Sequence, residues 1–292
     1  MRVGVVFPQT EIGADPGAIR AYMAGIEDAG YEHVLAYEHV LGADPEHHAG
    51  WTGPYNVSSQ FHEPFVLFGF LAAISELELV TGVLVLPQRQ TALVAKQAAA
   101  VDVLARGRFR LGVGLGWNQV EYEALGQDFH TRGQRIEEQV HLLRRLWTEP
   151  VVDFAGEQHR VRHAGLAPLP VQRPIPVWIG GGATPHTLRR IGRIADGWFP
   201  PGRPGAEFEG RLAVVRAAAS AIGRDPAALG IDARVEYGTG DLHRIADDVA
   251  AWRELGATHV SLNTMNAGFA TADQHVDALA RVAAVLPSSD AR

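Results

Sequence analysis

Cysteine is absent from all 292 residues of the sequence. Its absence excludes disulfide bonds, thiolate nucleophiles and cysteine-ligated metal ions. Lysine is nearly absent as well, because Lys96 is the single lysine among 26 basic residues. Reactions that depend on a lysine amine are therefore largely excluded.

The sequence also lacks a segment that would direct it into or across a membrane. No apolar run reaches the length that spans a bilayer, and Met1 and Arg2 lead directly into an expected strand at residues 3–7 instead of a signal peptide. The formal net charge is -7, so no overall positive field attracts nucleic acid or anionic lipid. We expect a soluble, cytoplasmic protein that acts on a small molecule.

Several catalytic signatures are missing too. The chain has 13 histidines but no H-E-x-x-H motif, and His47 and His48 lie in an expected loop without an evident carboxylate partner, so no metal site is predicted. No G-x-S-x-G elbow or matched pair of carboxylates is present. Hydrolytic chemistry therefore has no support in the sequence.

What the sequence does contain is a regular alternation of expected strands and helices. Residues 79–126 read as strand, helix, strand, helix. Residues 79–86 are a nearly unbroken apolar run, typical of a buried parallel strand, and Thr91 and Gly107 are the expected N-cap and C-terminal stop of the next helix. About eight strand–helix units recur, which predicts an α/β fold of the (β/α)8 TIM-barrel type, with residues 1–292 forming one domain.

The alternation is interrupted at residues 151–176, which are rich in proline and glycine. Residues 151–154 and 160–162 are expected to pair as a hairpin across residues 155–157. We interpret this segment as an insertion that precedes the fifth barrel strand, which is expected at residues 177–179.

One face of the expected strand at residues 109–116 has almost no side chains, because Gly112, Gly114 and Gly116 alternate with large apolar residues. A row of glycines in a strand usually marks a place where another group approaches the backbone closely. That group is either a cofactor ring or the side chains of neighbouring strands, which normally fill a barrel interior. The sequence leaves both interpretations open.

Three glycines follow the expected fifth strand, in the turn at residues 180–184. The turn exposes backbone N–H groups, Thr184 is placed to cap the next helix, and Pro185 suits the first helical position. Free N–H groups and the positive end of a helix dipole favour a bound phosphate. The alternative is an ordinary tight turn between a strand and a helix.

Glu38 and His39 lie at the C-terminal end of the second expected strand, where barrel enzymes place their catalytic groups. The His39 imidazole is suited to proton transfer near neutral pH, although a structural histidine is the common alternative. The loop at residues 41–63 is longer than a minimal connection, and its Trp51 and Tyr55 either close over a ligand or only pack the loop down.

Five motifs together resemble the bacterial luciferase-like monooxygenase family, in its branch that uses the deazaflavin coenzyme F420. They cover nearly the whole chain: TGV at 81–83, LGVGLGWN at 111–118 with Glu121 and Gly126 downstream, PLPVQ at 168–172, WIGGG at 178–182 and ADGW at 195–198. The resemblance implies a barrel that holds a flavin or deazaflavin at its C-terminal mouth, with the phosphate on the turn after the fifth strand, and it implies a homodimer.

The resemblance also implies a backbone bulge at Gly82-Val83, often with a cis peptide bond, that supports the cofactor ring. Trp117-Asn118 departs from the family's sugar-phosphate dehydrogenases, which have an acid near this place, so sugar-phosphate oxidation is not expected. The predicted cofactor-binding residues lie at the ends of the barrel strands: Glu38, His39, Gly82, Val83, Val85, Trp117, Asn118, Gly180, Gly181, Gly182, Ala183 and Thr184.

These patterns lead to a hypothesis and two alternatives. The hypothesis is an F420-dependent oxidoreductase that transfers a hydride between the deazaflavin and a small organic substrate, with His39 as the catalytic residue that moves the proton. The first alternative is an FMN-dependent two-component monooxygenase that uses O2 and reduced flavin supplied by a separate reductase. The second is a flavin-binding protein without catalytic activity.

Overall fold

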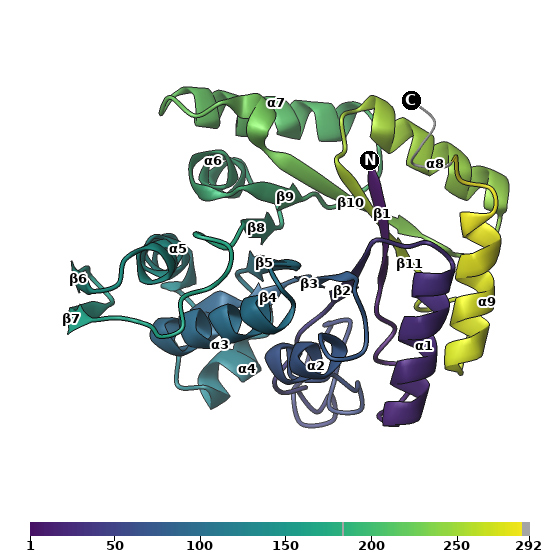
Figure 1. Ribbon diagram of the computed structural model, residues 1–292, viewed down its shortest axis with the longest axis horizontal. Coiled ribbons are helices and arrows are strands. Elements are labelled where there is room, and N and C mark those ends of the chain that lie inside the picture. The colour runs from purple at the N-terminus through teal and green to yellow at the C-terminus, as the bar shows by residue number, and fades with distance from the viewer. Residues whose placement is uncertain (183, 288–292) are drawn as a thin grey trace.

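Parallel strands close into a barrel that is surrounded by helices (Figure 1). The computed structural model describes residues 1–182 and 184–287. Within them the strands follow the order β3-β2-β1-β11-β10-β9-β8-β5-β4, and an additional pairing of β3 with β5 completes the ring. Since β4 continues the line of β3, the ring has eight positions, and the predicted TIM barrel is confirmed.

The barrel strands alternate with the helices along the chain. The strands are β1 (Arg2–Val6), β2 (His33–Ala36), β3 (Glu78–Thr81), β4 (Leu84–Val85), β5 (Phe109–Gly114), β8 (Val177–Gly180), β9 (Gly197–Phe199), β10 (Gly230–Glu236) and β11 (His259–Asn263). The helices are α1 (Pro16–Asp28), α2 (Pro64–Leu71), η1 (Leu86–Gln88), α3 (Thr91–Leu104), α4 (Gln119–Ala124), α5 (Arg132–Thr148), α6 (Pro185–Ile194), α7 (Ala206–Ser220), η2 (Pro226–Ala228), α8 (Leu242–Glu254) and α9 (Ala272–Ala283). None of the helices in these described ranges has both the length and the apolarity needed to cross a membrane.

The third barrel strand differs from its prediction. Residues 79–86 were expected to form one strand, but β3 ends at Thr81, and β4 begins at Leu84. Between them the Gly82–Val83 peptide bond is cis, as the family resemblance implied. The N-cap of α3 is also shifted by one residue, because Gln90 occupies the N-cap position, without a capping hydrogen bond from its side chain, and Thr91 is the first residue of the helix.

The insertion before the fifth barrel strand contains the predicted hairpin. It consists of β6 (Val152–Ala155) and β7 (Arg160–Ala164), which pair antiparallel outside the barrel (Figure 1). The turn of the hairpin is held by Glu138 of α5, whose carboxylate accepts hydrogen bonds from three successive backbone N–H groups at residues 157–159. The insertion is therefore fixed to α5.

The end of the barrel interior opposite the mouth is filled by a buried charged cluster instead of by aliphatic side chains. Arg110 donates to Asp232 over 3.1 Å and lies 3.1 Å from Glu78. Ser261 also donates to Asp232, over 2.9 Å, and its hydroxyl oxygen lies 2.9 Å from His33 Nε2. Burial raises the pKa of Asp232, but Arg110 and Ser261 act against this effect. The charges of Arg110 and Asp232 thus compensate each other, although His33 Nδ1 and Arg110 Nη1 are buried without a hydrogen-bond partner.

Two fully buried histidines are kept neutral by their surroundings. Burial, reinforced by the positive charge of Arg110, holds the pKa of His33 well below its ordinary value. Burial likewise lowers the pKa of His275 to about 4 from the ordinary 6.5. The Nδ1 atom of His275 lies 2.7 Å from the hydroxyl of Thr264, and its Nε2 atom lies 3.3 Å from a carboxylate oxygen of Glu11.

The lowered pKa of His275 predicts a loss of stability in mild acid. The unfolded chain binds a proton below pH 6.5 whereas the folded chain does so only near pH 4, so the free energy of unfolding falls by about 1.4 kcal/mol per pH unit between these values. The variant His275→Gln lacks this titrating group. When the pH is lowered from 6.5 to 5, its free energy of unfolding should therefore fall about 2 kcal/mol less than that of the wild type. Urea unfolding at several pH values measures the slopes.

A matched control is His47→Gln, which removes a histidine whose side chain is 78% exposed. This variant should keep the pH slope of the wild type. An unchanged slope in His275→Gln would contradict the assignment of the acid sensitivity to this buried ring.

Candidate active site

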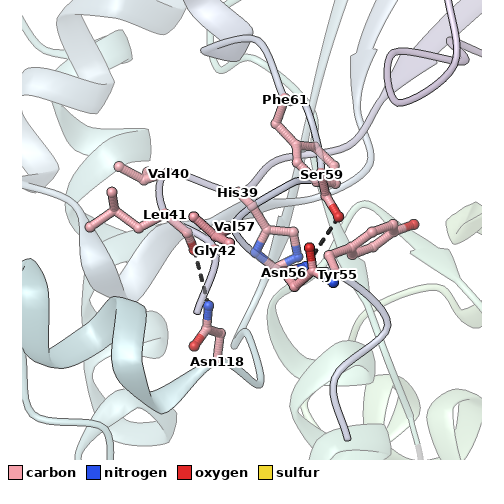
Figure 2. Close-up of a pocket in the computed structure, with 10 residues that line it drawn as sticks. All are labelled: His39, Val40, Leu41, Gly42, Tyr55, Asn56, Val57, Ser59, Phe61 and Asn118. Atoms are coloured by element: carbon pink, nitrogen blue, oxygen red, sulfur yellow. Dashed lines mark hydrogen bonds between the residues drawn. The ribbon is translucent and has the colours of Figure 1, made fainter. Parts of the chain in front are cut away.

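His39 lies at the barrel mouth, three residues beyond the end of β2. Its ring is surrounded by aromatic side chains, with centroid distances of 5.4 Å to Tyr55, 5.0 Å to Phe61 and 5.2 Å to Trp117. His39 lines a cavity of about 220 Å3 together with residues of the long loop after β2 and Asn118. Figure 2 shows the side chains that line this cavity. The aromatic residues exclude water from most of the ring and leave one part of it open to the cavity.

A buried carboxylate orients the His39 ring. Glu121 lies in the first turn of α4, and its Oε2 atom is 3.3 Å from His39 Nδ1. Burial favours a higher pKa for Glu121, but hydrogen bonds from His39, Gln88 and the N–H groups of Leu41 and Val40 outweigh it, so that the pKa is lowered. The carboxylate is thus ionised, and it accepts hydrogen bonds without donating any. His39 Nδ1 therefore carries the proton that the Glu121 carboxylate accepts.

The sequence did not single out Glu121 as a site residue, although it forms part of the family motif. The local signal is the spacing Asn118-x-x-Glu121, typical of a helix N-terminus. Asn118 caps α4 by accepting from the Glu121 N–H over 3.2 Å. The pairing with His39 has no counterpart in the local pattern, because 82 positions separate the two residues.

Glu38, predicted to contact a cofactor, is instead bound inside the protein. Its carboxylate accepts from Arg89 Nε over 2.7 Å and from the Val85 N–H over 2.5 Å, and Arg89 also pairs with Glu63 at 3.0 Å. Burial raises the pKa of Glu38, and the positive charge of Arg89 opposes this rise. Glu38 thus connects the end of β2 to β4 and does not line the cavity.

The row of glycines in β5 is filled by neighbouring side chains and not left open for a ring. A Cβ atom at Gly114 would lie 2.5 Å from Val83 Cγ2, and one at Gly180 would lie 2.7 Å from Val83 Cγ1. Gly116 is covered in the same way by Val85, which is 3% exposed and has almost no surface for a cofactor. Of the two interpretations that the sequence left open, packing by side chains of a neighbouring strand is confirmed, and a ring lying directly against Gly114 and Gly116 is contradicted. The glycines make room for the bulge at Val83.

Gly82 and Val83 themselves remain partly exposed. The bulge therefore keeps some of its surface after its inner side has packed against the glycines of β5 and β8.

The turn after β8 has the predicted form in the residues that are described. Thr184 caps α6 by accepting from the N–H of Thr187, and Pro185 is the first helical residue. Gly181 and Gly182 have φ values of 113° and 129°, which favour glycine. The Trp198 ring donates to the Gly181 carbonyl over 2.6 Å and fixes the turn. Ala183, also predicted here, lies outside the described residues.

Besides its bonds to Glu121, the long loop after β2 is held by contacts with Trp117 and Asn118. Asn118 donates to the Leu41 carbonyl over 3.1 Å, as Figure 2 shows. Farther along, Trp51 lies against Trp117 at 5.5 Å, with Gly53 beneath both indoles. Trp117 and Asn118, both predicted as cofactor contacts, thus hold this loop, and Asn118 also lines the cavity.

The opposite side of the mouth carries a cation that the sequence did not mark. Arg234 projects from β10 and donates to the Tyr37 hydroxyl over 2.9 Å. Burial raises the pKa of Tyr37 to about 12, although Arg234 opposes this effect. Arg234 also lies 2.7 Å from Glu236. The mouth therefore has an aromatic side with His39 and a charged side with Arg234.

Comparison with known proteins agrees with this architecture. Residues 1–285 match the family model described as luciferase-like monooxygenase. An uncharacterized protein of Mycobacterium tuberculosis is 30% identical over 219 residues, which are 75% of this chain and 75% of that protein. An FMNH2-dependent dimethylsulfone monooxygenase of Pseudomonas putida is 30% identical over 176 residues, 59% of this chain and 48% of that protein.

The barrel also has a close structural counterpart. The coenzyme F420-dependent tetrahydromethanopterin reductase of Methanopyrus kandleri superimposes with a TM-score of 0.75 at 14% identity, covering 96% of this chain and 97% of that one. At this identity the likeness concerns the fold alone. Since the family model spans all but the last residues and a relative is similar over three quarters of its length, the chain belongs to the luciferase-like monooxygenase family.

Proposed function

We propose that the protein is an F420-dependent oxidoreductase that transfers a hydride between the coenzyme and a small organic substrate. The observation that carries the proposal is the His39–Glu121 pair, with Nδ1 held by a charged carboxylate and the ring facing a cavity at the mouth. Hydride transfer to or from a carbonyl carbon requires such a proton acceptor and donor. F420, when bound, supplies the hydride chemistry at C5 of its deazaflavin ring.

The residues at the mouth fit such a coenzyme. The partly exposed bulge at Val83 offers an apolar support, and the N-terminus of α6, at the turn that Thr184 caps, favours a phosphate through the positive end of the helix dipole. In the oxidising direction, His39 Nε2 takes the proton of a substrate hydroxyl while the hydrogen on the adjacent carbon leaves as a hydride. Glu121 stabilises the imidazolium that forms, and the loop fixed by Trp117 excludes water.

An FMN-dependent monooxygenase is the second candidate, because the Pseudomonas putida relative is named as FMNH2-dependent. In that case a separate reductase supplies reduced flavin, whereas an F420-dependent enzyme needs a partner reaction that regenerates its coenzyme. For either coenzyme we propose that the protein is located in the cytoplasm, where such partners and coenzymes are found.

We further propose that the protein is a homodimer. Large apolar side chains on the adjoining helices α2 and α3 are exposed in the single chain, with Val66 74%, Leu93 52% and Leu104 58% accessible. Apolar side chains gathered on one face are typical of a surface that a partner covers.

The choice of coenzyme predicts a difference in affinity. In calorimetric titration we expect F420 to bind with a micromolar dissociation constant and FMN to bind at least about tenfold more weakly, a difference of about 1.4 kcal/mol. Micromolar FMN binding without any F420 binding would overturn the choice in favour of the monooxygenase.

The proton-transfer role predicts a selective loss of turnover. His39→Asn and Glu121→Gln should each lower kcat by about 100-fold or more, the usual contribution of general acid–base catalysis, while F420 affinity changes by less than about threefold. Turnover is followed through coenzyme absorbance with a substrate selected from small alcohols and ketones. Glu123→Gln, an exposed change on the same helix, is the matched control and should retain full activity. Unchanged kcat in His39→Asn would exclude this role.

The proposed dimer face predicts that one negative charge introduced into it prevents dimerisation. Leu93→Glu should convert a dimer into a monomer, because a buried unpaired carboxylate at the interface is costly. Ile222→Glu introduces the same charge at a side chain that is 53% exposed, just after α7, and should remain dimeric. Light scattering coupled to size exclusion reports the mass, and a wild type that is monomeric would refute the proposal.

A further inference from the structure

A second cavity, of about 210 Å3, lies beside β10 and shares no lining residue with the cavity at His39. It is bounded by the loop after β9, by the upper part of β10 and by α8. Five charged residues line it: Arg203, Arg234, Glu236, Arg244 and Asp248. Three cations and two carboxylates give this cavity a net positive charge in a chain that is negative overall.

The cavity exists because β9 is shorter than β10. The two strands pair only at Gly230 with Gly197 and at Ile231 with Trp198, whereas β10 continues to Glu236. Among the described residues, no strand lies beside the rest of β10 on this side. The upper half of β10 therefore has an open edge next to the cavity.

That open edge carries backbone donors. The Gly230 N–H points toward β9, where it donates to the Asp196 carbonyl over 3.0 Å. Because main-chain groups alternate in direction along a strand, the N–H groups of Arg234 and Glu236 point to the same side. Arg244 occupies part of this edge by donating to the Glu236 carbonyl over 2.7 Å. The backbone N–H groups of Arg234 and Glu236 remain able to donate hydrogen bonds to a ligand.

The charges of the cavity are unequally matched. Arg244 pairs with Asp248 at 2.7 Å, and Arg234 pairs with Glu236 at 2.7 Å. Arg203 is exposed and has no carboxylate within 4.0 Å among the described residues. The two pairs fix the guanidinium groups of Arg234 and Arg244, while Arg203 supplies the uncompensated charge.

We propose that this cavity binds an oxyanion group, a carboxylate or a phosphate, of a small ligand. Arg203 neutralises the charge, because a planar guanidinium matches the two oxygens of a carboxylate or a phosphate. The backbone N–H groups of β10 and the fixed Arg244 supply further donors. Glu236 and Asp248 do not repel the anion strongly, because each is already neutralised by its arginine.

The position of the cavity gives the anion two possible sources. Phe199, whose carbonyl accepts from the Gly181 N–H over 3.4 Å, directly precedes Pro200, which lines the cavity. The cavity thus adjoins the turn that we propose for the coenzyme phosphate, within reach of an anionic coenzyme tail. Arg234 also reaches the mouth through Tyr37, so an anionic group of the substrate is the other source. The oxyanion site itself does not depend on which redox coenzyme the protein uses.

The test uses calorimetric titration of the full chain with two probes, inorganic phosphate and a tetraglutamate peptide. The wild type should bind at least one of them in the millimolar range or more tightly, and more weakly as salt is added. Arg203→Gln should weaken this binding by at least about tenfold, the usual effect of losing a charged hydrogen bond. Arg216→Gln removes an exposed arginine from α7 outside the cavity and should bind within about twofold of the wild type.

Two further titrations separate the sources. If the coenzyme tail occupies the cavity, Arg203→Gln and removal of the oligoglutamate tail from F420 each weaken coenzyme binding, and the two losses do not add. If the substrate occupies it, Arg203→Gln leaves F420 affinity unchanged, and the probe still binds to coenzyme-loaded protein. Either result supports the site.

Failure to bind either probe, or equal affinity in the wild type and Arg203→Gln, would overturn the oxyanion site. Because the probes are titrated without a redox coenzyme, this outcome is independent of whether F420 or FMN binds at the mouth.

Discussion

The buried carboxylate of Glu121 is the interaction on which the mouth of the barrel depends. It accepts hydrogen bonds from His39, from Gln88 Nε2 at 3.1 Å and from the backbone where the long loop leaves β2. One anion therefore joins α4, η1 and the start of the loop. Because it is withdrawn from water, each of these bonds is stronger than at the surface, and the loss of any partner is costly. The orientation of His39 follows from this arrangement and not from the loop alone.

The same principle appears at the opposite end of the barrel interior, where Arg110 and Asp232 meet. Both ends are organised by buried charges, and a small apolar cluster consists of Val6, Leu35, Val80 and Met265, with Tyr37 and Phe199 packed against it. A purely aliphatic filling would pack the barrel as well, but it would not fix which groups face the mouth. Replacing buried ion pairs by apolar residues is often neutral for stability. We therefore infer that the buried charges serve to position side chains and not to increase the free energy of unfolding.

The architecture follows directly from sequence patterns because it depends on local periodicity and capping. Alternating apolar runs predicted the barrel, and Thr184-Pro185 predicted the start of α6, which the structure confirms. The interruption at Gly82–Val83 has no such local signal, since the apolar run continues through it, and only the family resemblance indicated it. Periodicity describes a segment, and it does not reveal where that segment meets another.

The candidate site was therefore predicted only in part. His39 was located by its place at a strand end, but Glu38, its neighbour, is bound by Arg89, which is 51 positions away. The glycines of β5 correctly marked a close approach, yet the approaching group is Val83 from the bulge between β3 and β4. In both cases the residue was recognised and its partner was not, because partners come from distant parts of the chain.

The position of Gly53 beneath two indoles restricts how this loop can diverge during evolution. A Cβ atom there would lie 2.2 Å from Trp117 Cζ3 and 2.8 Å from Trp51 Cζ2, so every other amino acid would separate the rings. Its neighbours Thr52 and Pro54 are exposed and meet no such limit. Substitutions at Thr52 and Pro54 can thus change the outer surface of the loop, and with it the molecules that the loop meets, while a side chain at position 53 would loosen its contact with the barrel.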